Sequence, residues 1–126
     1  MKDCSIKGAI KYFIASSGAF CVLFGAWLSH GAAFLNTGQQ QSLITALNYQ
    51  FIHTLALLSV YVWYNLAPQK SLKITLLLFT AGILLFCGSI YLKTLTEFSM
   101  LGKLAPIGGM TLAVAWISLV FQRQKS

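Results

Sequence analysis

Charged residues are absent from most of this chain and mark the ends of its apolar stretches. No Lys, Arg, Asp or Glu occurs between Lys11 and Lys70, which is room for two membrane-spanning helices of about 20 residues each. The polar run at 36–41, which contains Gly38, divides this stretch, since clustered polar residues with a glycine are typical of a turn. The whole pattern predicts four spanning helices, at 12–34, 43–66, 74–92 and 104–121.

Composition restricts the fold class further. Hydrophobic residues make up 57% of the 126 residues and charged residues only 9%, whereas a soluble domain carries about 25% charged residues. Disordered chains are polar and poor in aromatic residues, but here aromatics reach 13%. We therefore expect an all-α polytopic integral membrane protein, a compact four-transmembrane-helix bundle in which residues 1–126 form a single domain.

The net charge of +7 indicates orientation rather than nucleic-acid binding. Lys and Arg are scattered over helix ends instead of forming one patch, and cytoplasmic loops of membrane proteins carry the excess of these residues. Seven of the nine lie at the two termini and in the second loop, against Lys93 and Lys103 in the third. We expect both termini in the cytoplasm of a bacterial-type inner (plasma) membrane, with the lipid bilayer as partner and no nucleic acid.

Cysteine usage predicts neither a disulfide nor a metal centre. Cys4, Cys21 and Cys87 are far apart and show no zinc-ligand spacing. Two of them fall inside apolar runs, where cysteine is usually a small buried hydrophobe. The acidic residues Asp3 and Glu97 lie outside the predicted spans, so no carboxylate is available there to orient a histidine for catalysis. We expect no enzymatic activity, no cofactor and no bound metal.

Small residues recur at four-residue steps on the first and last predicted helices. This spacing places them on one helix face and lets neighbouring backbones approach closely. It serves packing within the bundle or a homodimer face, and we favour the first. The small residues are Ser17, Cys21, Gly25, Ser29 and Ala33 on the first helix, and Ala105, Gly109 and Ala113 on the last.

Polar residues within the predicted spans form the candidate site. Such residues are costly in lipid and usually face the bundle interior. Those with functional chemistry fall towards the outer half of the bilayer: His30, Gln50, His53, Ser89 and Tyr91. One interpretation is a hydrogen-bond network that joins the helices, which we prefer. Another is a small-ligand, proton or metal site, because histidine titrates near neutrality.

Four segments together resemble the domain-of-unknown-function 423 family, to which the eukaryotic transmembrane protein 256 is related. The segments are 24–26 with 29–32, 49–58, 85–92 and 105–109, and they follow the family's order along nearly the whole chain. The resemblance implies a small inner-membrane protein of four helices and no established activity. Cys87 stands where the family's third motif has a serine.

These observations favour a non-enzymatic membrane protein that acts as an assembly or interaction module, as a homo-oligomer or with another membrane protein. The alternative is a small-solute, proton or metal-handling protein that uses the polar cluster. The two hypotheses differ in the role of His53. An assembly module should tolerate His53→Gln, whereas a proton or metal site should not, since an amide does not titrate near neutrality.

Overall fold

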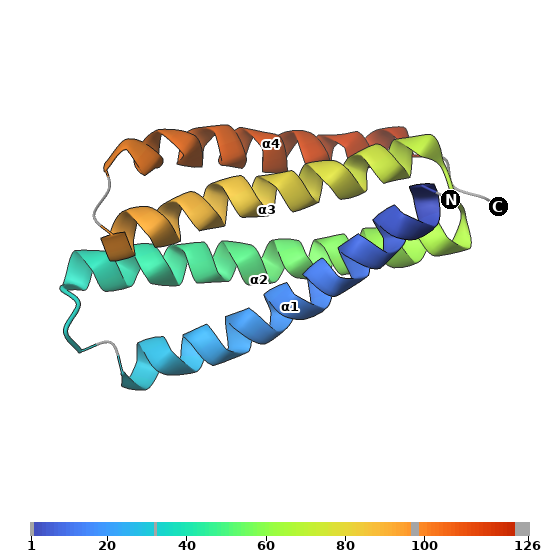
Figure 1. Ribbon diagram of the computed structural model, residues 1–126. Helices are drawn as coiled ribbons and strands as arrows, with labels where there is room; N and C mark the ends of the chain where they lie inside the picture. The colour runs from blue at the N-terminus through green and yellow to red at the C-terminus, as the bar shows by residue number, and fades with distance from the viewer. Residues whose placement is uncertain (1, 32, 97–98, 123–126) are drawn as a thin grey trace.

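The computed structural model describes residues 2–31, 33–96 and 99–122 as almost entirely helical (Figure 1). The elements are α1 (Lys2–His30), α2 (Thr37–Leu66), α3 (Lys70–Thr96), the short 3-10 helix η1 (Ser99–Lys103), α4 (Leu104–Ser118) and the 3-10 turn η2 (Leu119–Phe121). Within the described residues, four segments are long and apolar enough to cross a membrane: Ser5–His30, Thr37–Leu66, Lys70–Thr96 and Leu104–Phe121. The chain is an all-α, multi-pass membrane protein.

Three helices differ in length from the predicted spans because they extend past the apolar core. α1 begins ten residues before Tyr12, at Lys2, and it ends at His30, four residues before the predicted end at Phe34. Its first turns are held by Ile10, which is buried in the core, and by Lys7, whose Nζ lies 5.3 Å from the centre of the Tyr64 ring. α3 likewise continues to Thr96. Glu97, which was expected in the third loop, lies outside the described residues.

The polar run at 36–41 is a helix start rather than a loop. Asn36 Oδ1 accepts a hydrogen bond from the backbone N–H of Gln39 at 2.8 Å, and Gln39 Oε1 accepts one from the backbone N–H of Asn36 at 3.0 Å. This reciprocal capping box satisfies two amides that would lack partners at the helix end. α2 therefore begins at Thr37, six residues before the predicted start of its span.

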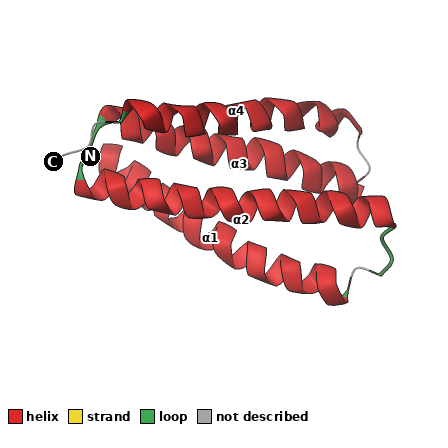
Figure 2. Ribbon diagram, turned by 180° about the vertical axis from the view of Figure 1, so that it is seen from behind, coloured by secondary structure: helices red, strands yellow, loops and turns green. Residues whose placement is uncertain are grey.

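The helices run antiparallel to their neighbours in an open bundle (Figure 1). The described parts of α1 and α4 lie at opposite edges and do not approach each other, while α2 and α3 lie between them. Seen from behind, short connections join the helix ends (Figure 2). α1 starts beside the α2–α3 connection and diverges from α2 towards its own C-terminal end (Figure 1).

The closest contact between helices is the one between α3 and α4, and it depends on two glycines. A Cβ atom on Gly108 would lie 2.3 Å from the backbone nitrogen of Phe86, and one on Gly82 would lie 2.6 Å from Cδ2 of Leu112. Real Cβ atoms do not approach so closely. The absent side chains thus let the two backbones meet, which is how helices associate in lipid without a hydrophobic driving force.

Candidate functional site

A chain of hydrogen bonds joins α1, α2 and α3 inside the membrane. The Tyr91 hydroxyl of α3 donates to Gln50 Oε1 of α2 at 2.7 Å. Gln50 Nε2 donates to Ser17 Oγ of α1 at 2.8 Å, and Ser17 Oγ shares a hydrogen bond of 2.7 Å with Thr54 Oγ1 of α2. We call these residues, Ser17, Gln50, Thr54 and Tyr91, the polar chain.

The polar chain is largely buried, with Tyr91 half-buried at one end, and its members bond one another. Ser17, Gln50 and Thr54 are each less than 8% exposed, and burial of an unpaired amide or hydroxyl costs several kcal/mol in hydrocarbon, on the order of 4–8. Gln50 avoids this cost by using both ends of its amide. In the described part of the chain, every buried side-chain nitrogen or oxygen has a hydrogen-bond partner.

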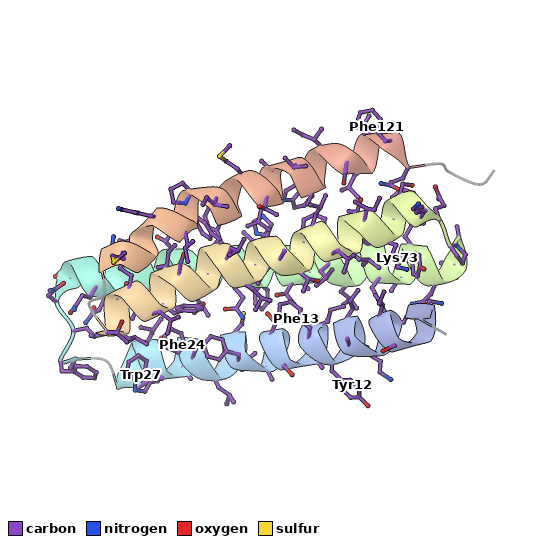
Figure 3. The ribbon with its side chains drawn as sticks, turned by 45° about the horizontal axis from the view of Figure 1, so that its top comes forward. Tyr12, Phe13, Phe24, Trp27, Lys73 and Phe121 are labelled. Atoms are coloured by element: carbon purple, nitrogen blue, oxygen red, sulfur yellow. The ribbon has the colours of Figure 1, made fainter. Side chains whose placement is uncertain are left out.

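Aromatic side chains of α1 enclose the Tyr91 end of the polar chain. The Tyr91 ring lies edge-on to Phe20 and Phe24, with ring centres 5.5 and 5.2 Å apart. Phe24 also packs on Trp27, and in Figure 3 these two side chains project from α1 towards the other helices, whereas Tyr12 points away. These ring contacts pack the Tyr91 side chain against α1.

His53 faces a different neighbour from Gln50, although both lie on α2. Three residues along a helix is a rotation of about 300°, so His53 turns towards α4 while Thr54 stays on the Gln50 face. His53 Nδ1 lies 2.6 Å from the carbonyl oxygen of Tyr49, and its ring is 5.8 Å from that of Trp116. The histidine sits among aromatic rings of its own helix, α3 and α4, apart from the polar chain.

The five residues of the predicted cluster therefore separate in space. Gln50 and Tyr91 meet, but His53 does not join them. His30 is the exposed last residue of α1. Ser89 is buried and donates to the carbonyl oxygen of Phe86 in its own helix at 2.9 Å. The structure thus does not bring the two histidines into one site.

Two members of the polar chain were not predicted as part of the cluster. Thr54 lies one turn after Gln50 on the same face, a spacing that could have identified it. Ser17 was assigned to a packing face, and its hydroxyl adds hydrogen bonds to that role. Both residues lie at the same level in the membrane as the rest of the polar chain. Recognising this from the sequence would require the helix boundaries to be known.

A second hydrogen-bonded group joins α3 to the last residue of α4 and to Gln122, which directly follows η2, at the end of the bundle where α1 begins. Gln122 Nε2 donates to Thr75 Oγ1 at 3.1 Å, and Thr75 Oγ1 shares a hydrogen bond of 2.7 Å with Ser118 Oγ. The Ser71 hydroxyl donates to Gln122 Oε1 at 2.7 Å. Sequence reasoning missed this group, because Gln122 was assigned to the tail beyond the last helix.

Some residues of the two predicted packing faces lie in helix contacts, and others are exposed. On α1, Ser17 and Cys21 are buried and Gly25 faces Leu47, whereas Ser29 is exposed. Ala33 lies beyond the end of α1 and is also exposed. The α4 face lies about one residue away from the actual contact: Ala105 and Gly109 are half-buried and Ala113 is exposed. The residues that α4 buries are instead Gly108, Leu112 and Ala115.

The described residues do not gather the ligands that a metal would need. Among them, no three of His, Cys, Asp or Glu come together, and a zinc site takes three or four such ligands. Cys87 Sγ donates to the carbonyl oxygen of Ala46 at 3.3 Å. This thiol acts as one more link between α2 and α3.

Comparisons with known proteins agree with this membrane architecture. The sequence model of DUF423, described as a protein of unknown function, matches residues 24–109. A UPF0382 membrane protein of Haemophilus influenzae is 36% identical over 122 residues, which is 96% of this chain and 98% of that protein. The UPF0382 membrane protein YwdK of Bacillus subtilis is 33% identical over 95% of this chain and 94% of its own length. No solved structure matches the chain.

Proposed function

The chain belongs to the DUF423 family, and we propose that it is a non-enzymatic assembly module of the bacterial inner membrane. It binds a second copy of itself or another membrane protein through its lipid-facing helices. The observation that carries the proposal is the polar chain. Its hydroxyl and amide groups bond one another across three helices, so they serve to join helices and are not directed at a substrate.

The first point of support comes from comparing the described residues with the groups that an enzyme or a carrier would need. A catalytic triad needs a nucleophile, a base and an orienting group within hydrogen-bond reach. The buried polar groups described here are already hydrogen-bonded, and the two acidic residues of the sequence, Asp3 and Glu97, lie outside the spans predicted from hydropathy. Many transporters rely on broken helices, whereas α1, α2 and α3 are each continuous over their described lengths, and the lysines within the spans lie towards the helix ends.

The uncovered edges of the bundle are the second point of support. In the most apolar windows of α1 and α4 only 17% of the residues are buried, against 39% in α2 and α3. The outer face of α1 exposes Ala15, Ala19 and Ala26, and small residues are the ones that let another helix approach in lipid. α1 is thus the edge best suited to receive a second copy.

Orientation follows from charge. We infer cytoplasmic termini because Lys and Arg concentrate at the end of the bundle that holds Lys7, Lys70 and Lys73. The opposite end carries Lys93 and Lys103. Cysteine labelling of an engineered Gln40→Cys site from the periplasm tests this inference, and labelling only after the membrane is opened would contradict it.

The competing function is the handling of a solute, a proton or a metal. Substitution of His53 distinguishes this function from assembly. Native mass spectra in mild detergent would compare the protein with the His30→Ala/His53→Ala double variant and with His53→Gln. The assembly proposal predicts a ligand-free oligomer whose stoichiometry is the same in all three. A small molecule or metal that the wild type retains and both variants lose would overturn it, as would a strict monomer without partner.

A further inference from the structure

A cavity of about 380 Å³ opens at the end of the bundle opposite the first turn of α1. It is lined by residues of α2, α3, η1 and α4, namely Gly38, Gln41, Ser42, Thr45, Ile90, Lys93, Thr94, Gly102 and Ala105. Its volume is in the range of small-molecule sites, roughly 300–1,000 Å³. The cavity lies near the membrane boundary, because α2 begins and α3 ends there.

The polar side chains in this lining have unused hydrogen-bonding capacity. Elsewhere, hydroxyls such as those of Ser59, Thr80 and Thr111 donate to carbonyl oxygens of their own helices. The side chains in the cavity behave differently: none of Gln41, Ser42, Thr45 and Thr94 bonds any other residue in the part of the chain that the structure describes. These exposed or half-buried side chains therefore offer the cavity several donors that no described residue uses.

Lys93 supplies the positive charge of the cavity. Its Nζ would lie 3.1 Å from a Cβ atom on Gly102, so the glycine leaves room for the lysine side chain to lie against η1. Within the described ranges Lys93 makes neither an ion pair nor a hydrogen bond. It also borders a neighbouring hollow lined by Asn36, Gly38 and Gln39 in the first turn of α2.

We propose that this cavity binds a phosphate group, carried by the headgroup of an anionic phospholipid or present as free phosphate. A lysine, three hydroxyls and a side-chain amide from two helices line one space at the membrane boundary. Phosphate accepts hydrogen bonds on all its free oxygens and is attracted by the ammonium charge. Ile90 and Ala105 give the same cavity an apolar part suited to the glycerol and first acyl carbons of a lipid.

The test uses delipidated full-length protein in neutral detergent and measures binding of phosphatidylglycerol, phosphatidylcholine and inorganic phosphate at constant ionic strength. We expect Lys93→Gln to weaken phosphatidylglycerol binding about fivefold or more, since one lysine at a membrane surface contributes about that factor. Lys103→Gln is the matched control, because it removes the same charge at the same end outside the cavity lining. It should change binding less than twofold.

The remaining outcomes distinguish the two sources of the phosphate group and identify the results that would overturn the proposal. Inorganic phosphate that binds alone and competes with phosphatidylglycerol identifies a free-phosphate site; no competition identifies the lipid. Ser42→Ala, a small change at an exposed position, should also weaken binding, which guards against misfolding of the lysine variant. Equal losses in Lys93→Gln and Lys103→Gln, or no saturable binding of any probe, would overturn the proposal. The oligomeric state plays no part in these readouts.

Discussion

α4 and α1 occupy the two edges of the bundle, but they are attached in different ways. α4 packs against α3 through close backbone contact, because neither Gly82 nor Gly108 has room for a Cβ atom. α1 meets α2 and α3 through the polar chain and a row of aromatic rings, and its Gly8 and Gly18 would each accept a Cβ atom without contact. One edge should therefore be sensitive to added volume, and the other to loss of polar groups.

The largest effect is expected where volume is added between α3 and α4. Gly108→Ala places a methyl group 2.3 Å from a backbone nitrogen, which cannot move as a side chain can. Overpacking typically costs about 1–3 kcal/mol and occasionally more, so we expect a loss of about 3 kcal/mol in the free energy of unfolding. Reversible unfolding by sodium dodecyl sulfate in mixed micelles, followed by circular dichroism, measures it.

The matched control for this variant is the next residue. A Cβ atom on Gly109 would lie 3.6 Å from the Phe86 side chain, which is ordinary contact, so Gly109→Ala should cost less than about 0.5 kcal/mol. Equal losses from the two substitutions would contradict the claim that the close contact at Gly108 sets the stability of this edge, because alanine has the higher helix propensity and propensity alone predicts no loss.

An intermediate effect is expected at the centre of the polar chain. Gln50→Leu keeps the approximate size of the side chain but removes the hydrogen bonds to Ser17 and Tyr91. Interhelical hydrogen bonds in membranes average about 0.6 kcal/mol, and the stranded tyrosine hydroxyl adds to the loss, so we expect about 1–2 kcal/mol. Amide hydrogen exchange should rise in α1 and stay constant in α4.

Gln41→Leu is the matched control, because it makes the same substitution at an exposed position of the same helix. Its unfolding free energy should stay within about 0.5 kcal/mol of the wild type. If Gln50→Leu were equally neutral, or if exchange rose in α4 as much as in α1, the polar chain would not be what attaches α1.

The smallest effect is expected at the end of the polar chain. Tyr91→Phe retains the contacts with Phe20 and Phe24 and loses one hydrogen bond, so it should cost about 0.6 kcal/mol in the same unfolding assay. In the Gln50→Leu background the same substitution should cost nothing, since the hydroxyl has already lost its acceptor. Full additivity of the two losses would show that the hydroxyl acts elsewhere.

The contrast between the two edges also explains which features could be predicted from the sequence. The gap in charge from Lys11 to Lys70 and the apolar runs suffice for four membrane helices, because lipid imposes that constraint on every span. The capping box at Asn36 could have placed the start of α2 from its sequence spacing. The polar run was instead interpreted as a loop because its residues are hydrophilic.

The site was harder to predict because helix rotation is not encoded in hydropathy. Gln50 and Tyr91 were recognised as intramembrane polar residues, and they meet. His53 was placed in the same cluster because of its predicted level in the bilayer, yet it turns towards Trp116. On α4 the predicted stripe through Gly109 is about one residue away from the contact at Gly108, because small residues occur on both faces.

Proximity of Ser17 and Thr54 is the most direct test of the claim that the polar chain attaches α1 inside the membrane. In a background without native cysteines, Ser17→Cys/Thr54→Cys should cross-link nearly completely with a membrane-permeant oxidant, since the two hydroxyl oxygens are 2.7 Å apart. Ser16→Cys/Thr54→Cys should not cross-link, because Ser16 is exposed on the outer face of α1. Equal cross-linking of the two pairs, or none in the first, would contradict the account.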